Sequence, residues 1–348
     1  MKIIVLAGGL SPERDVSLSS GSLIANSLIK SGNDVLLIDV YEGMSIKEHQ
    51  NLDDLFYTKE NGKTYSYIVP TIEPDLELIK KNNNGQNALI GENVLILCQY
   101  ADIVFVALHG SMGENGQLQA TFDNFGIKYT GTGYIGSLLA MDKDITKKLL
   151  VQAGIKTAEW ILLNIKNDNI NSINEKIGFP CVVKPCSCGS SIGVSIVYDE
   201  SQLKQAINSA EKYEDFVLIE KMIKGREFSI GILDGEVLPV IEIITKEGFY
   251  DYKNKYQSGM TSEVCPAQLS TELTAEVQKL SLKVHEILRL RDYSRIDFIL
   301  NENNDFVCLE ANALPGMTPT SLIPQEVAVL GIGYDELCKK IAYLALKR

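Results

Sequence analysis

The sequence lacks the features that are typical of disulfide-rich secreted proteins, of zinc-binding proteins and of nucleic-acid-binding proteins. Its 348 residues include only seven cysteines, scattered without paired Cys-x-x-Cys spacing, so neither a disulfide framework nor a zinc site is indicated. Lysine and arginine (33) are outnumbered by aspartate and glutamate (45), which gives a net charge of −12 with no basic block. Nucleic acid and anionic membranes are therefore excluded as expected partners, and an anionic ligand would need a locally basic site.

Long hydrophobic runs are also missing. After Met1 and Lys2 the chain enters Ile-Ile-Val-Leu-Ala-Gly-Gly, which is too short for a signal sequence or a membrane-spanning helix. We therefore expect a cytoplasmic protein. The length predicts two or three domains at about 150 residues each.

The hydrophobic periodicity predicts alternating strands and helices. Residues 2–7 and 35–40 are expected to be parallel strands joined by a helix at 17–30, and residues 102–108 a central strand of the same sheet. The other expected elements are helices at 115–124, 142–153, 200–212, 273–289 and 335–347 and strands at 158–163, 181–184, 194–197 and 216–220. The fold class is therefore mixed, α/β at the N-terminus and α+β in the rest.

The segment from Arg295 to Asn312 is the most informative one. Folded as a hairpin about Asn303-Asn304, it places Asp297 opposite Glu310. Strand alternation predicts one polar face, with Arg295, Asp297, Ile299, Cys308, Glu310 and Asn312, and one apolar face, with Ile296, Phe298, Leu300, Val307, Leu309 and Ala311. Carboxylates about 4.5–5.5 Å apart repel each other, which favours a hard cation such as Mg²⁺ or Mn²⁺ between them. An exposed hairpin whose charges face water is the alternative.

Two further segments suggest a nucleotide-binding site. The run from Lys184 to Gly193 follows a strand and is rich in glycine and serine, so its backbone N–H groups and Lys184 could hold phosphates, although such runs are often plain turns. Lys143 begins a preceding helix and could add a second positive contact or be a solvated helix lysine. Glu220 and Glu227 bound the link between two strands, where they could contact adenosine or be surface charges.

Loops elsewhere carry further candidates. The run from Tyr250 to Gly259 has three tyrosines and includes Lys255, which suits a lid that excludes water, or a partner interface. Glu13 and His109 lie in loops that follow the first and third strands of the N-terminal sheet, where sheet enzymes bind ligands. Glu13 could hold an ammonium group or complement a helix dipole, and His109 could be a structural donor.

Over essentially its whole length the chain resembles the D-alanine-D-alanine ligases of the ATP-grasp superfamily. The motifs that carry the resemblance are Ser11 to Leu18, His109 to Gln119, Met141 to Lys143, Lys184 to Gly193, Tyr250 to Tyr256, Arg295 to Asp297, Glu310 to Asn312 and Pro315 to Leu322. The resemblance implies an N-terminal α/β substrate-binding domain (1–136), a central ATP-grasp domain (137–224) and a C-terminal domain with the lid and metal site (225–348). It also implies the joining of two D-alanines at the expense of ATP, in a homodimer, for peptidoglycan synthesis.

The resemblance assigns a role to each candidate. Two Mg²⁺ or Mn²⁺ ions would be held by Asp297, Glu310 and Asn312. ATP would be bound by Lys143, Lys184, Ser191, Glu220, Lys221, Glu227 and Lys255. The catalytic group would comprise Glu13, Ser190, Tyr256, Arg295 and Ser321, with His109, Gly316 and Leu322 as further substrate contacts. In these roles Glu13 meets the first D-alanine's ammonium, Ser321 the second D-alanine's carboxylate, and Arg295 the tetrahedral intermediate.

Some positions depart from the family pattern, and alternatives stay open. Asn115 stands where the family usually has aspartate and Ala120 where it has glycine, although Asn115 can still cap the following helix. The pair Lys255-Tyr256 argues against a D-lactate acceptor and Leu322, more weakly, against D-serine. The strand-helix-strand opening could also mark a nicotinamide-dependent oxidoreductase, but this chain lacks the third glycine that the dinucleotide-binding motif requires at the first turn. A catalytically silent nucleotide-binding module is the remaining alternative.

Overall fold

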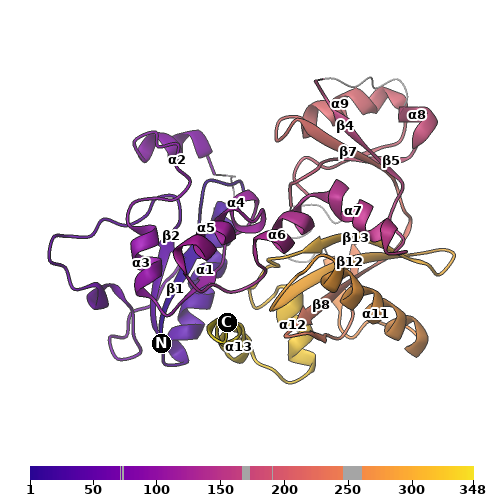
Figure 1. Cartoon of the computed structure of the whole chain (residues 1–348). Helices are drawn as coiled ribbons and strands as arrows, with labels where there is room; N and C mark the ends of the chain where they lie inside the picture. Colours follow the sequence, from indigo (N-terminus) through magenta and orange to yellow (C-terminus); the bar gives the residue numbers. More distant parts are fainter. Residues whose placement is uncertain (71, 73, 167–172, 190, 246–260) are drawn as a thin grey trace.

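The described part of the chain forms three β-sheets, each covered by helices (Figure 1). The computed structural model describes residues 1–348 apart from residues 71, 73, 167–172, 190 and 246–260. The predicted fold class is confirmed, with a parallel sheet at the N-terminus and antiparallel sheets in the rest. In the described part of the chain, none of the helices combines the length and hydropathy of a membrane span.

The N-terminal sheet has the strand order β2-β1-β3, with β1 (Lys2–Ala7) paired in parallel to β2 (Asp34–Asp39) and β3 (Ile103–Val106). The connecting helix α1 (Arg14–Lys30) begins three residues earlier than the periodicity predicts. Its first residue is fixed by tertiary contacts, because the Arg14 guanidinium lies 2.7 Å from an Asp39 carboxylate oxygen and donates to the carbonyl of Gly9. The region is completed by η1 (Leu52–Leu55), α2 (Leu76–Asn82) and α3 (Val94–Tyr100).

The helix expected at residues 115–124 is α5 (Gln117–Phe125), which begins two residues later and ends one residue later than predicted. The short helix α4 (Ser111–Glu114) precedes it and was not predicted. Gly116 separates them with φ +86°, a backbone conformation that interrupts a right-handed helix. The Asn115 side chain accepts a hydrogen bond from the Gln117 N–H, so it does satisfy the start of α5. The sequence interpretation missed α6 (Tyr134–Met141), which leads to the predicted α7 (Lys143–Gln152).

The central sheet is antiparallel, in the order β4-β7-β5-β6. Its strands are β4 (Trp160–Asn164), β5 (Cys181–Pro185), β6 (Ser195–Val197) and β7 (Phe216–Lys221), and its helices are α8 (Ile173–Lys176) and α9 (Glu200–Ala210). The four predicted strands and the helix at 200–212 are confirmed to within a few residues. A small core, in which Leu203 and Ile207 of α9 meet Val183 and Val217, holds this unit together.

The C-terminal sheet is larger and follows the order β11-β10-β8-β12-β13, with β9 paired to β8. Its elements are β8 (Gly225–Leu233), β9 (Glu236–Val237), β10 (Ile241–Thr245), β11 (Thr261–Val264), α11 (Thr271–Ile287), β12 (Tyr293–Asn301) and β13 (Phe306–Asn312). On one face of the sheet, Val277 and Val284 of α11 pack into a core with Phe228, Ile230 and Phe298. The other face is polar and turns toward the central sheet.

The predicted hairpin register is confirmed for the pairs from Arg295 to Asp297 and is wrong by one residue between Asp297 and the turn. Asp297 pairs with Glu310 and Arg295 with Asn312, as expected. The register then shifts, because Phe298 pairs with Cys308 and leaves Leu309 as an extra, bulged residue. Since a shift of one residue exchanges the two faces, the predicted positions of Cys308, Val307 and Leu309 are wrong. Cys308 and Phe306 belong to the apolar core, whereas Leu309 faces a cavity.

The last two helices connect the C-terminal part of the chain to the N-terminal sheet. They are α12 (Leu322–Val329), which the sequence analysis did not predict, and the predicted α13 (Tyr334–Leu346). Leu337, Ile341 and Ala345 of α13 share one core with the strands of the N-terminal sheet, and Figure 1 shows α13 beside that sheet. The boundaries 1–136, 137–224 and 225–348 stay a prediction.

His285 of α11 is expected to make stability depend on pH. It is only 8% exposed, its Nδ1 lies 2.7 Å from Ser294 Oγ, and burial lowers its pKa to about 4. Because the unfolded chain binds this proton nearer pH 6.5, stability should fall as the pH drops from 6.5 toward 4, by about 2 kcal/mol between pH 7 and pH 5. Denaturant unfolding at both pH values should show that His285→Gln loses this component and that His49→Gln, at an exposed histidine, keeps it. Equal pH dependence in all three proteins would contradict the assignment.

Candidate active site

A cavity of about 560 Å³ separates the central sheet from the polar face of the C-terminal sheet. The strands β5, β6 and β7 supply one wall, and β8, β10, β12 and β13 supply the other. Eight of the predicted site residues line it, namely Lys143, Lys184, Ser191, Glu220, Lys221, Glu227, Asp297 and Glu310. The structure therefore brings the nucleotide and metal candidates together, although they come from segments more than 160 residues apart.

Lys184 and Glu220 belong to a buried triad with Lys147. One carboxylate oxygen of Glu220 contacts the Lys184 ammonium, and the other lies 2.7 Å from the Lys147 ammonium. Burial lowers the pKa of Lys147, and although burial alone would raise the pKa of Glu220, the two ammonium groups lower it overall. Two lysines and one glutamate leave a net positive charge at the cavity wall, which suits an anionic ligand.

Lys147 is a residue that the sequence interpretation missed. It lies four residues after Lys143 and therefore on the same face of α7, which is the signal that could have identified it. Its side chain is 1% exposed, and its ammonium also donates to Thr157 Oγ1 and lies over the Trp160 ring.

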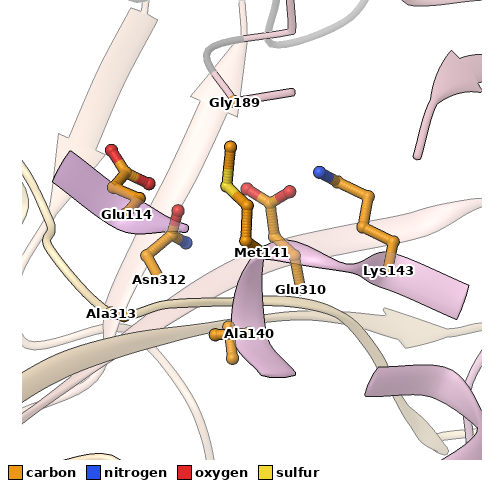
Figure 2. Close-up of a pocket in the computed structure, with 9 residues that line it drawn as sticks. Glu114, Ala140, Met141, Lys143, Gly189, Glu310, Asn312 and Ala313 are labelled. Atoms are coloured by element: carbon orange, nitrogen blue, oxygen red, sulfur yellow. The ribbon is translucent and has the colours of Figure 1, made fainter. Parts of the chain in front are cut away.

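Lys143 ties α7 to the glycine- and serine-rich loop. Its ammonium donates to the Cys188 carbonyl at 2.6 Å, and its backbone N–H donates to the Cys186 carbonyl. At 7% exposure it is not a solvated helix lysine. With Glu310 and Asn312 it also lines a small adjoining cavity, where Figure 2 shows Lys143 and Glu310 extending toward the loop at Gly189.

Asp297 is held by donors on three strands of the polar face. Its Oδ1 accepts from Ser229 Oγ at 2.7 Å and Arg295 Nε at 3.0 Å, and its Oδ2 accepts from an Arg295 terminal nitrogen at 2.8 Å and Asn312 Nδ2 at 3.1 Å. Ser229 was also missed, although strand alternation from Glu227 places it on this face. Residues that orient a ligating carboxylate usually matter for metal binding.

The donor set at this hairpin fits a hard divalent cation. Carboxylate oxygens of Asp297 and Glu310 and the amide of Asn312 are the ligands that Mg²⁺ and Mn²⁺ prefer. No group of three or more His, Cys, Asp or Glu suited to a metal occurs among the residues that the structure describes. The two carboxylates would therefore share the cation with Asn312 and with oxygens of a bound ligand.

Glu13 and His109 bring the N-terminal loops to the same region. A Cβ atom added to Gly110 would lie 3.0 Å from Glu13 Oε2, and one added to Gly189 3.8 Å from it, so this carboxylate sits between the histidine loop and the glycine- and serine-rich loop. Burial lowers the pKa of His109, but a hydrogen bond with Glu114 and the charge of Glu13 raise it overall.

Ser321 and Gly316 meet at the start of α12. Ser321 Oγ accepts from the Thr318 N–H at 3.0 Å, and a Cβ atom on Gly316 would lie 3.1 Å from it. Leu322 is the first residue of α12 and packs with Ile241 and Ile243. A helix N-terminus favours an anionic group such as a carboxylate. The predicted residues Ser190, Lys255 and Tyr256, and the expected lid from Tyr250 to Gly259, lie outside the described residues.

Comparisons with known proteins cover nearly the whole chain. Residues 2–132 match the family model described as D-ala D-ala ligase N-terminus, and residues 149–343 match the one described as D-ala D-ala ligase C-terminus. A D-alanine-D-alanine ligase of Pediococcus pentosaceus is 42% identical over 345 residues, which is 98% of this chain and 96% of the relative. The crystal structure of a D-alanine-D-alanine ligase from Bacillus anthracis is similar with a TM-score of 0.75 and 32% identity, covering 100% of this chain and 98% of that one. Its complex with ATP gives a TM-score of 0.74 at 30% identity, with the same coverage.

Proposed function

We infer the function from the premise that this chain belongs to the D-alanine-D-alanine ligase family: it is an ATP-dependent ligase that joins two D-alanines and releases ADP and phosphate. The dipeptide serves peptidoglycan precursor synthesis. The observation that carries the inference is the cavity in which the paired carboxylates Asp297 and Glu310 face the lysines Lys143 and Lys184.

We propose that the residues of the cavity bind ATP and direct its terminal phosphate to a D-alanine carboxylate. A carboxylate is a poor electrophile, and its attack on the γ-phosphate gives an acyl phosphate that the second amine can attack. Two Mg²⁺ or Mn²⁺ ions, when bound by Asp297, Glu310 and Asn312, would neutralise the phosphate charge. The net positive triad around Glu220 supports the placement of the phosphates beside Lys184. The proposed ATP contacts are Lys143, Lys184, Ser191, Glu220, Lys221, Glu227 and Lys255.

We propose that the two D-alanines lie between the N-terminal loops and the start of α12. Glu13 would receive the first ammonium group, supported by Ser190 and Tyr256, and His109 would hold the neighbouring loop. Ser321, with Gly316 and Leu322 beside it, would receive the second carboxylate. Arg295 would stabilise the oxyanion of the tetrahedral intermediate, which needs preorganised donors. The lid from Tyr250 to Gly259 would protect the acyl phosphate from water.

Three finer proposals rest on the family resemblance: the enzyme is a homodimer, it works in the cytoplasm, and its domains are residues 1–136, 137–224 and 225–348. D-Serine and D-lactate are not favoured as second substrates, because the curated relatives are D-alanine-D-alanine ligases.

A product assay tests the proposed function. With ATP and Mg²⁺, phosphate release should require D-alanine, should not respond to L-alanine, and should be matched by D-alanyl-D-alanine. In a competition with equal D-alanine, D-serine and D-lactate near neutral pH, the D-alanine dipeptide should dominate. ATP turnover that is indifferent to D-alanine would reject the ligase, and a mixed product would reject only the acceptor assignment.

Lys147→Met is expected to weaken ATP binding. Without Lys147, Glu220 and Lys184 form a neutral pair, so Lys184 attracts the phosphates less, and we expect KM for ATP to rise about tenfold, or about 1.4 kcal/mol. Steady-state kinetics at saturating D-alanine measures the change. Lys148→Met is the matched control, because Lys148 lies on the same helix, is 65% exposed and pairs with Asp144 rather than with Glu220. An unchanged KM in a folded Lys147→Met protein would show that the triad has no part in ATP binding.

A further inference from the structure

Glu326 of α12 is a buried carboxylate that the proposed reaction does not use. It is 0% exposed, and its two oxygens accept hydrogen bonds from the Gly231 N–H at 3.2 and 3.0 Å. A buried carboxylate is costly unless it is paired or hydrogen-bonded, so a nearby positive group is expected. The residue lines none of the cavities of the proposed active site.

The strand register places this carboxylate beside Arg295. Gly231 on β8 pairs directly with Arg295 on β12, and directly paired residues of antiparallel strands project to the same face about 4.5–5.5 Å apart. A Cβ atom added to Gly231 would lie 2.2 Å from Glu326 Oε2. The Glu326 carboxylate therefore occupies the space of the missing side chain, on the face to which Arg295 projects.

The electrostatics agree with this placement. Burial raises the pKa of Glu326 well above its ordinary range, the positive charge of Arg295 opposes that rise, and the charge of Asp297 adds to it. Arg295 is thus flanked by Asp297 along its own strand and by Glu326 on the β8 side. The fork to Asp297 fixes one edge of the guanidinium, and Glu326 is the acidic group that approaches it from the β8 side.

We propose that Glu326 is a positioning residue that orients Arg295 toward the tetrahedral intermediate. This inference rests on the proposed function. Gly231 is needed for this arrangement, because any larger residue at this position would displace the Glu326 carboxylate. The same helix begins beside Ser321, which is proposed to hold the second D-alanine. Glu326 therefore links the residue that stabilises the new bond to the element that positions the incoming substrate.

The test compares Glu326→Gln with the double variant Gly231→Ala/Glu326→Ala. Glutamine keeps the shape and one acceptor for the Gly231 N–H but removes the ionisable group, whereas two alanines fill the space without a polar group. In both we expect kcat for dipeptide formation to fall about tenfold, as for other residues that orient catalytic groups, with KM for ATP nearly unchanged. Thermal unfolding of each protein separates a kinetic effect from a loss of folding. Glu286→Gln, which removes an exposed charge from α11, should behave as wild type.

The outcomes distinguish the inference from the proposed function. Dipeptide synthesis by the wild type with a lowered kcat in either folded variant supports positioning by Glu326. Wild-type kcat in the folded variants, with any change confined to the unfolding temperature, overturns it and leaves the ligase assignment intact. If Glu326→Gln does not fold, the double variant decides alone. A wild type without dipeptide synthesis overturns both.

Discussion

Replacing Glu310 with glutamine is expected to lower the rate of D-alanyl-D-alanine synthesis by about 10²–10³-fold. The substitution keeps the size of the side chain but removes one of the two carboxylates that face each other across β12 and β13. A cation would then be held by one charge fewer, and the terminal phosphate would meet the attacking carboxylate without sufficient neutralisation. Initial rates of ADP and dipeptide formation over a range of Mg²⁺ concentrations measure the effect.

The control for this experiment is Glu302→Gln. Glu302 lies exposed in the turn of the same hairpin, so the variant makes the same chemical change within a few residues of the site. It should keep wild-type rates and the wild-type Mg²⁺ requirement. If Glu310→Gln also kept them, the proposed metal site and the mechanism built on it would be wrong.

Arg295→Lys is expected to have the second largest effect. Lysine keeps the positive charge but cannot form the fork to Asp297, which joins two guanidinium nitrogens to the two carboxylate oxygens at 3.0 and 2.8 Å. The oxyanion would lose a preorganised donor, and we expect kcat to fall about 10²-fold while KM for ATP changes little. Steady-state kinetics with both substrates varied provides the measurement.

Arg289→Lys is the matched control, since Arg289 is exposed in the turn that follows α11. A loss of ATP affinity in Arg295→Lys without a loss of kcat would assign Arg295 to nucleotide binding. That result would also remove the basis for a positioning role of Glu326.

The pairing of Asp297 with Glu310 was predicted from a turn centred on Asn303-Asn304, but the pairs next to the turn are shifted by one residue, and the bulge at Leu309 restores the predicted register at Asp297. The bulge at Leu309 could not be predicted, because it depends on a distant segment. The Cys308 N–H donates to the Lys156 carbonyl, and the Thr157 hydroxyl donates to the Cys308 carbonyl. These bonds fix Cys308 from the free edge of β13, and local sequence carries no sign of them.

For the candidate site, too, the local motifs were predicted and some contacts between distant segments were not. Residues within recognisable motifs, such as Lys184 and Glu220, were predicted and lie in one cavity. Lys147 was missed although its position four residues after Lys143 was a signal, and Glu326 could not be predicted because only the fold brings its partner Gly231 to it. A buried ionisable residue can be predicted from the sequence only when its partner is close in the sequence, so pairs between distant segments are found only in the folded structure.

The position of α13 affects how the protein can be made. Leu337, Ile341 and Ala345 complete the core of the sheet formed by β1, β2 and β3, so the core of that sheet is incomplete until α13 has been synthesised. The strands β1, β2 and β3 are therefore made long before the helix that covers them, and part of their apolar surface stays exposed until α13 packs against them.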